Sequence, residues 1–165
     1  MTGALARTDR AALRLLRTRL HGRALERGAI AYTTAGEFGA IWIAAALTGA
    51  ALDQERRASW LAVAAFVPAS LGANFLVKIA VRRQRPRLAG LPPLGRTPAT
   101  FSFPSGHAAT SFAAANAIGA LLPRARPGLI AAASLMALTR PYLGLHYPSD
   151  ALAGAALGTV LARAR

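Results

Sequence analysis

The sequence contains no cysteine, which excludes disulfide bonds, thiolate catalysis and cysteine-ligated metals. Acidic residues are scarce as well: only six of the 165 residues are Asp or Glu, so a carboxylate cluster for a divalent metal is not expected. Lysine occurs once, as Lys78, against 19 arginines. Such a bias makes the single lysine a candidate for a specific role.

What the sequence does have is an unusual combination of apolar residues and positive charge. Hydrophobic residues make up 54% of the chain, yet its formal net charge is +14. Most basic residues lie outside the apolar stretches, whereas a nucleic-acid-binding domain spreads arginine over a solvated face. We therefore expect an integral membrane protein with basic flanks, and no nucleic-acid partner.

Residues 1–30 form a basic segment in which leucine and arginine recur at helical spacing from residue 9 to residue 28. One face would carry leucines and the other arginines, namely Leu13, Leu16, Leu20 and Leu25 against Arg10, Arg14, Arg17 and Arg23. The segment lacks the apolar core and the cleavage site of a signal peptide. It is typical of an amphipathic helix that lies on the membrane surface and is attracted by anionic headgroups.

Residues 31–165 contain five apolar stretches and little strand-type alternation. The stretches cover residues 33–52, 58–80, 107–122, 127–143 and 149–163. A membrane span needs about 20 apolar residues; the first two stretches reach that length, and the other three are shorter and rich in Ala and Gly, which lets helices approach closely. We therefore predict an all-α fold, a polytopic membrane bundle of about five transmembrane helices with an N-terminal interfacial helix.

Arginine is concentrated between the second and third stretches, where positions 82, 83, 85, 87 and 96 within residues 81–106 are all arginine. Positive residues favour the cytoplasmic side of a membrane. A cytoplasmic N-terminus followed by two spans places this segment in the cytoplasm too, so the two assignments agree. We interpret Arg82, Arg83 and Arg87 as a juxtamembrane anchor rather than as catalytic residues.

Three clusters of polar residues lie at the ends of the apolar stretches. The first runs from Lys78 through Arg85 to Pro86, the second is Pro104-Ser105-Gly106-His107, and the third comprises Arg140, His146 and Asp150. The predicted topology brings all three to the same face of the membrane, although they are far apart in the sequence.

The residue types in these clusters suit a phosphate group. Lys78, Arg85 and Arg140 supply three cations, and the arginine fork matches phosphate oxygens. A helix that begins at Ser105-Gly106 offers free backbone N–H groups to an anion, with close approach at the glycine and a further hydroxyl from Ser105.

Two histidines and one aspartate remain for catalysis. Phosphoryl transfer can use one histidine as the nucleophile and another as the proton donor, and His107 and His146 are both available. Asp150 can accept a hydrogen bond from His146, which would fix the tautomer of the imidazole and stabilise its positive charge in the transition state.

The three clusters together resemble the three signatures of the type 2 phosphatidic acid phosphatase family. These signatures are Lys-x6-Arg-Pro, Pro-Ser-Gly-His and (Ser/Thr)-Arg-x5-His-x3-Asp. Order and internal spacing match over about the second half of the chain, with Thr139 where serine is common. The resemblance implies a metal-independent phosphatase without cofactors. It implies that His146 is the nucleophile that forms a phosphohistidine and that Asp150 orients the His146 ring. It also implies that His107 is the acid that protonates the leaving oxygen and later activates water. The residues it implies in phosphate binding are Lys78, Arg85, Ser105, Gly106 and Arg140.

Two further polar residues are candidates for supporting roles. Glu37 falls near the start of the first apolar stretch, where a carboxylate is costly. It either pairs with a basic residue, lines the headgroup pocket or stays protonated, or it simply lies near the lipid headgroups. Asn74 lies one turn before Lys78 and either orients that lysine or forms an interhelical hydrogen bond.

The expected substrate is a lipid-linked phosphate. Many bacterial family members have six spans, and the loss of one span before the first motif would turn the catalytic face to the cytoplasm. That side favours phosphatidic acid, phosphatidylglycerophosphate or a polyprenyl-linked sugar phosphate over polyprenyl diphosphates released outside. The short form with Gly-Glu in its first span also resembles small actinobacterial members, one type of which is proposed to remove the 5-phosphate from decaprenylphosphoryl phosphoribose in arabinan precursor synthesis. This resemblance implies an integral protein of the bacterial plasma membrane, and we take removal of that 5-phosphate as the specific prediction.

Two other functions fit the motifs less well. Vanadium haloperoxidases hold vanadate in a similar anion pocket, but they are large and soluble. Because the anion pocket is similar, vanadate is expected to inhibit this protein. A non-catalytic membrane scaffold, the other alternative, would need neither the two histidines nor the aspartate.

Overall fold

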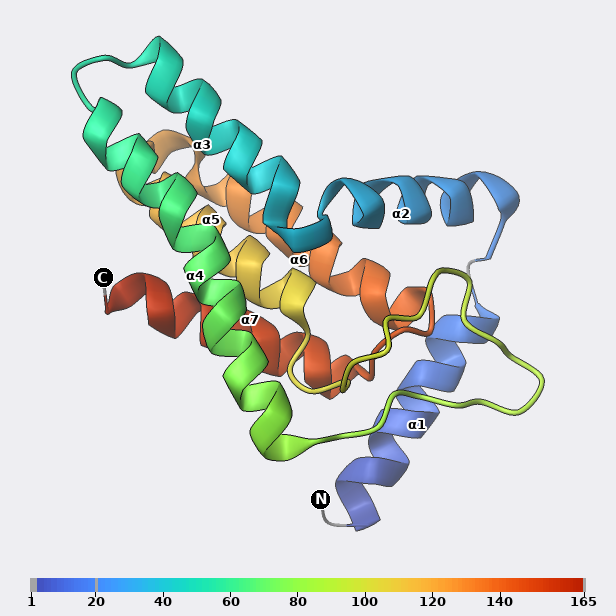
Figure 1. The fold of residues 1–165 in the computed structure, drawn as a ribbon. Coiled ribbons are helices and arrows are strands. Elements are labelled where there is room, and N and C mark those ends of the chain that lie inside the picture. The colour runs from blue at the N-terminus through green and yellow to red at the C-terminus, as the bar shows by residue number, and fades with distance from the viewer. Residues whose placement is uncertain (1–2, 20, 165) are drawn as a thin grey trace.

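The computed structural model describes residues 3–19 and 21–164, and within those ranges the protein is all-α (Figure 1). The helices are α1 (Gly3–Thr18), α2 (Arg23–Ala35), α3 (Ala40–Leu52), α4 (Arg57–Val81), α5 (Gly106–Leu121), α6 (Arg126–Tyr142) and α7 (Pro148–Arg163). Two short 3₁₀ turns, η1 (Glu37–Gly39) and η2 (Pro123–Ala125), join α2 to α3 and α5 to α6. The predicted all-α fold is confirmed.

α5 lies at the centre of the bundle, in contact with α3, α4, α6 and α7. Most of its residues are buried, and the majority of these are alanine. Small side chains let the neighbouring helices approach closely. α1 lies outside this bundle, beside the long loop that follows α4 (Figure 1).

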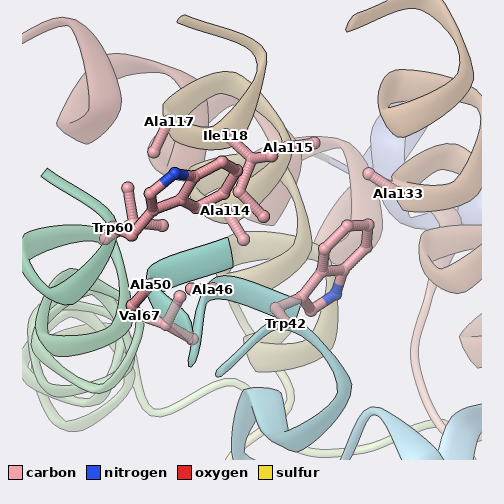
Figure 2. Close-up of a cluster of buried hydrophobic side chains, with 11 residues drawn as sticks. Trp42, Ala46, Ala50, Trp60, Val67, Ala114, Ala115, Ala117, Ile118 and Ala133 are labelled. Atoms are coloured by element: carbon pink, nitrogen blue, oxygen red, sulfur yellow. The ribbon is translucent and has the colours of Figure 1, made fainter. Parts of the chain in front are cut away.

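Two tryptophans fill space that the alanines of α5 leave open (Figure 2). Trp42 of α3 and Trp60 of α4 are 5% and 4% exposed. Each indole N–H has a partner, since Trp42 donates to the hydroxyl of Ser111 (2.8 Å) and Trp60 to the carboxylate of Asp53 (3.1 Å). Buried indoles usually require such a partner, so these bonds help to fix how α3 and α4 pack.

α7 packs against α5 in direct backbone contact. A Cβ atom at Gly154 would lie 2.4 Å from the carbonyl oxygen of Ser105, and one at Gly158 would lie 2.1 Å from that of Ala109. Only glycine permits this approach. It brings the first turn of α7 against the start of α5, where the backbone N–H of Ser105 donates to the carbonyl oxygen of Asp150 (2.9 Å).

Among the described helices, α4 is long and apolar enough to cross a membrane by itself. α2 and η1–α3 meet the same test as a pair bent by 49°. α5, α6 and α7 have 16 or 17 residues each, so the number of five spans stays a prediction. Large apolar side chains are exposed along α4, which suits contact with lipid; they include Leu61, Phe75, Leu76 and Ile79.

The first predicted stretch, residues 33–52, is not one continuous helix. α2 ends at Ala35 and α3 begins at Ala40, with positive φ angles at Phe38 (54°) and Gly39 (79°) between them. Left-handed backbone conformations interrupt an α-helix. The break places Glu37 in an exposed turn instead of within a continuous helix.

The N-terminal segment also differs from the prediction of one helix over residues 9–28. The chain breaks between α1 and α2, where Gly22 has an extended conformation (φ −163°, ψ 146°). Glycine loses more conformational entropy in a helix than other residues, which favours a break there. Arg17, predicted on the polar face, is only 6% exposed, whereas Leu25, predicted on the apolar face, is 54% exposed. Leu20 lies outside the described residues.

Candidate active site

The three polar clusters meet around a cavity of about 510 Å³. The residues that line it are Gly36, Glu37, Phe38, Leu71, Asn74, Phe75, Lys78, Arg85, Arg96, Pro98, Ala99, Thr100, Gly106, His107, Thr110, Arg140 and His146. Of the site residues predicted from the sequence, only Ser105 and Asp150 do not line this cavity. Both are fully buried, at 0% exposure.

Lys78 and Arg140 reach the cavity from α4 and α6, and both are nearly buried, at 7% and 3% exposure. Lys78 donates to the carbonyl oxygen of Phe101 (2.8 Å), and Arg140 donates to the hydroxyl of Thr33. Neither side chain forms an ion pair with a carboxylate in the part of the chain that the structure describes. Buried cations held only by neutral acceptors attract an anion strongly.

Arg85 contacts the imidazole of His146 directly. Its Nη1 lies 3.0 Å from Nε2 of His146 and also donates to the carbonyl oxygen of Leu145 (2.8 Å). Its Nε donates to the carbonyl oxygen of Thr100 (2.9 Å). A guanidinium only donates hydrogen bonds, so Nε2 of His146 is the acceptor. The contact therefore assigns the neutral tautomer with the proton on Nδ1 and a lone pair on Nε2.

Burial keeps His146 neutral. The residue is 2% exposed, and this desolvation lowers its pKa from 6.5 to about 3. The positive charges of Arg85, Arg140 and Lys78 act in the same direction, and Asp150 acts against them. An uncharged imidazole at neutral pH is the form that a nitrogen nucleophile needs.

The Asp150 carboxylate is shared among several donors. Its Oδ1 accepts from Nη1 of Arg83 (2.6 Å), and its Oδ2 accepts from the backbone N–H of Tyr147 (2.8 Å) and the hydroxyl of Ser102. Oδ2 lies 3.6 Å from Nδ1 of His146. That distance is too long for a hydrogen bond, so the bond predicted between these residues is replaced by an electrostatic contact.

His107 stands in the first turn of α5. Its Nε2 lies 3.0 Å from the carbonyl oxygen of Thr33 in α2. A carbonyl oxygen only accepts, so Nε2 carries a proton and Nδ1 is the ring atom left to exchange one. The imidazole is therefore oriented by a helix that precedes all three sequence motifs.

The start of α5 contributes backbone groups to the cavity. Gly106 lines the cavity, and the first N–H groups of a helix have no intrahelical partner. Ser105 is the N-cap of α5, and its Oγ accepts from the backbone N–H of Ala108 (3.5 Å). The serine thus holds the helix start in place from behind the cavity wall.

Asn74 and Glu37 have different surroundings. Asn74 donates to the carbonyl oxygen of Pro104 (3.3 Å), so it holds the Pro-Ser-Gly-His loop and does not contact Lys78 through this amide. This bond joins α4 to the loop before α5, so it is neither the predicted contact with Lys78 nor a hydrogen bond between two helices. Glu37 lines the cavity and is close enough to Arg140 to interact with it electrostatically.

Sequence reasoning missed several residues around the cavity. Arg83, interpreted as a membrane anchor, bridges Asp150 (2.6 Å) and Asp9 (2.7 Å) and lies 4.1 Å from the ring centre of Tyr147. Thr33 contacts both His107 and Arg140 but belongs to no motif. A signal existed for Asp9 alone, because a carboxylate is unusual in so basic a segment.

Comparison with known proteins identifies phosphatases that act on lipid phosphates as relatives of this chain. A model of the PAP2 superfamily matches residues 57–165, which contain all three motifs. A decaprenylphosphoryl-5-phosphoribose phosphatase from Mycolicibacterium smegmatis is 39% identical over 127 residues, or 77% of this chain and 69% of the relative. The protein of the same name from Mycobacterium tuberculosis is 38% identical over 120 residues, or 73% and 67%. A lipid A 1-phosphatase from Rhizobium etli is 39% identical over 109 residues, or 61% and 47%.

Solved structures share the fold. The transmembrane PAP2 type phosphatidylglycerolphosphate phosphatase from Bacillus subtilis superposes with a TM-score of 0.77 at 25% identity, covering 99% of this chain and 85% of that one. Aquifex aeolicus LpxE superposes with a TM-score of 0.71 at 20% identity, covering 93% and 92%, which shows similarity of fold. The chain therefore belongs to the PAP2 superfamily and is a phosphoric monoester hydrolase that acts on lipid phosphates.

Proposed function

We propose that this protein hydrolyses the phosphate monoester of decaprenylphosphoryl-5-phosphoribose through a phosphohistidine on His146. The observation that carries the mechanism is the 3.0 Å contact between Nε2 of His146 and Nη1 of Arg85, in a cavity that Lys78 and Arg140 also line. Three cationic side chains supply the charge stabilisation that phosphoryl transfer needs.

Substrate binding activates the nucleophile in this scheme. Phosphate oxygens bind Lys78, Arg85, Arg140 and the backbone N–H groups at the start of α5 near Gly106. When one of these oxygens accepts from Nη1 of Arg85, the guanidinium no longer donates to Nε2 of His146. The lone pair is then free to face phosphorus.

In the first chemical step, Nε2 of His146 attacks phosphorus. An N–P bond forms while the P–O bond to the alcohol of the substrate breaks. His107, which takes up a proton when the negatively charged phosphate binds beside it, gives that proton from Nδ1 to the leaving oxygen, so that the alcohol departs neutral. The positive charge that develops on the ring of His146 is stabilised by Asp150, whose Oδ2 is 3.6 Å away.

The second step hydrolyses the phosphohistidine. His107, now neutral, takes a proton from water at Nδ1 while the water oxygen forms a bond to phosphorus. The N–P bond breaks and inorganic phosphate leaves. Both histidines return to their starting protonation states, so no external reactant besides water is consumed.

The choice of lipid is supported by two observations. Two relatives at 38% and 39% identity carry the name decaprenylphosphoryl-5-phosphoribose phosphatase. Glu37 also adds a hydrogen-bond acceptor to the cavity besides the cationic residues, which suits a ribose hydroxyl. Phosphatidic acid, the simplest alternative, has no hydroxyl in its headgroup.

The active site lies on the cytoplasmic face in this proposal. The arginines of residues 81–106 and of the N-terminal segment both favour that side. Phosphatidic acid and phosphatidylglycerophosphate are the alternative substrates available there, and a polyprenyl diphosphate is a third.

The test is phosphate release from these four lipids by the purified protein in detergent with EDTA present. His146→Ala is measured beside the wild type, and Asp53→Asn, in the loop between α3 and α4, is the control. We expect the phosphoribose lipid to be the fastest substrate, Asp53→Asn to be active and His146→Ala to be inactive. A faster reaction with another lipid would reassign the substrate and leave the mechanism intact. Activity of His146→Ala equal to that of the wild type would reject the mechanism.

A further inference from the structure

One face of α1 is buried and carries charged residues. Asp9, Leu13 and Arg17, spaced four residues apart, are 4%, 0% and 6% exposed. The other described residues of α1 are exposed or half-buried. Residues four apart share one side of a helix, so α1 turns two charges and a single leucine toward α6 and α7.

Both charged residues of this face bind segments next to the cavity. Arg17 donates to the carbonyl oxygen of Pro92 (2.6 Å) in the loop that follows α4. Asp9 binds the first turn of α7, where its Oδ1 accepts the backbone N–H of Ser149 (3.0 Å) and its Oδ2 accepts the hydroxyl of the same residue. The residue that follows Ser149 is Asp150.

Arg83 connects Asp9 to Asp150. Its Nη2 donates to Asp9 (2.7 Å) and its Nη1 to Asp150 (2.6 Å), and the three side chains are 12%, 4% and 0% exposed in the order Arg83, Asp9, Asp150. Charges interact strongly when so little water separates them. Asp9 offsets the positive charge of Arg83, so that the guanidinium does not cancel the negative charge of Asp150 as it is felt at the imidazole of His146.

We propose that Asp9 is a positioning residue of the active site. Through Arg83 and Ser149 it holds Asp150 in place and limits how far Arg83 cancels the negative charge with which Asp150 stabilises His146. The PAP2 superfamily model matches residues 57–165, and α1 lies outside that range. In this proposal the site is therefore completed by a helix that the superfamily model does not cover. This inference rests on the proposed roles of His146 and Asp150. Because Asp9 does not line the cavity, its loss slows the chemical step without weakening substrate binding.

The experiment measures kcat and KM with decaprenylphosphoryl-5-phosphoribose and, in parallel, with phosphatidic acid. The variants are Asp9→Asn, Arg83→Gln and the double variant. Asp53→Asn is the matched control, because Asp53 also pairs with an arginine (Arg56, 2.6 Å) but lies in the α3–α4 loop. Leu13→Ala controls for lost packing on the same face of α1.

We expect Asp9→Asn to lower kcat by about 10-fold to 100-fold with KM unchanged within about twofold, as for loss of a residue that supports a catalytic group. Asp53→Asn and folded Leu13→Ala should keep the kcat of the wild type. If Asp9 acts mainly through Arg83, the double variant should be little slower than Arg83→Gln alone.

A wild-type kcat in Asp9→Asn would overturn the inference, and so would a loss that Leu13→Ala reproduces at the same drop in thermal stability. If Asp9→Asn does not fold, Arg83→Gln and Ser149→Ala replace it, and wild-type kcat in both would overturn the inference as well. The His146→Ala variant separates a failure of the role proposed for Asp9 from a failure of the proposed mechanism. If that variant is inactive and Asp9→Asn is fully active, only this inference fails; if His146→Ala is active, the proposed mechanism fails and the inference with it.

Discussion

Nη1 of Arg85 lies 3.0 Å from Nε2 of His146, so the guanidinium covers the lone pair that we propose as the nucleophile. A phosphate oxygen has to take over this N–H before the imidazole can reach phosphorus. Binding of the substrate and activation of the nucleophile are therefore coupled through a single hydrogen bond. The same contact requires a neutral ring with its proton on Nδ1.

His146 should stay uncharged in mildly acidic solution. Its pKa is lowered from 6.5 to about 3, chiefly by burial. The pKa of His146 is lower in the folded protein than in the unfolded chain, so between pH 6.5 and about 3 the unfolded chain binds a proton that the folded protein does not. As far as His146 is concerned, the folded state is therefore most stable above pH 6.5 and loses stability as the pH falls toward 3. We expect ¹⁵N NMR of the protein in detergent to show the Nδ1–H tautomer at pH 5, with the signal assigned by its absence in His146→Ala. A titration midpoint near 6.5 would contradict the observed burial.

Arg85→Lys should weaken inhibition by vanadate. Lysine keeps the positive charge but loses the fork that contacts both His146 and the anion. We expect the inhibition constant to rise by about 10-fold or more, since hydrogen bonds to charged groups contribute about 1.5–3 kcal/mol. Arg87→Lys is the control, because Arg87 is an exposed neighbour that does not line the cavity. Equal constants for wild type and Arg85→Lys would remove Arg85 from the anion site.

His107→Gln should affect substrates according to their leaving groups. An alkyl alcohol needs a proton to depart, so release of a lipid alcohol should fall by about 100-fold or more. p-Nitrophenol is a much weaker base and leaves without protonation. With p-nitrophenyl phosphate we expect a burst of p-nitrophenol equal to the enzyme present, followed by slow turnover, because water is no longer activated. Equal losses with both substrates and no burst would rule out an acid role for His107.

Glu37→Gln should change the choice of substrate. If the carboxylate binds a ribose hydroxyl, kcat/KM for decaprenylphosphoryl-5-phosphoribose should fall by about 10-fold. Hydrolysis of phosphatidic acid should change little, since that headgroup has no hydroxyl to bind. The two substrates are compared with the same preparation. A parallel loss with both would assign Glu37 to the phosphate site or to the fold instead.

Gly158→Ala should destabilise the bundle. The added Cβ would lie 2.1 Å from the carbonyl oxygen of Ala109, so α7 has to move away from α5. Overpacking of this kind costs about 1–3 kcal/mol, and the displacement should also reduce activity because Asp150 belongs to α7. Gly128→Ala is the control, because a Cβ at that position in α6 meets no atom within 4 Å. A thermal midpoint unchanged in Gly158→Ala would contradict the contact.

Much of this protein can be predicted from local sequence patterns. The apolar stretches predict where α4 to α7 lie, because the length and composition of a helix are properties of neighbouring residues. Lys78, Arg85, His107 and Arg140 also follow from motifs of fixed spacing, and all four line the cavity. The break between α2 and α3 was harder to predict, because the positive φ at Phe38 has no strong local signal.

Which charges belong to the site was decided by the tertiary structure. Arg83 and Arg87 look alike in the sequence, yet Arg83 bonds to Asp150, 67 residues away, and to Asp9, 74 residues away. Arg87 remains exposed. A buried charge is tolerated only where a partner meets it, and such a partner can come from any part of the chain. The sequence by itself therefore determined the helices and the phosphate-binding motifs, while the packing of α1 against α6 and α7 decided that Asp9 and Arg83 lie beside them.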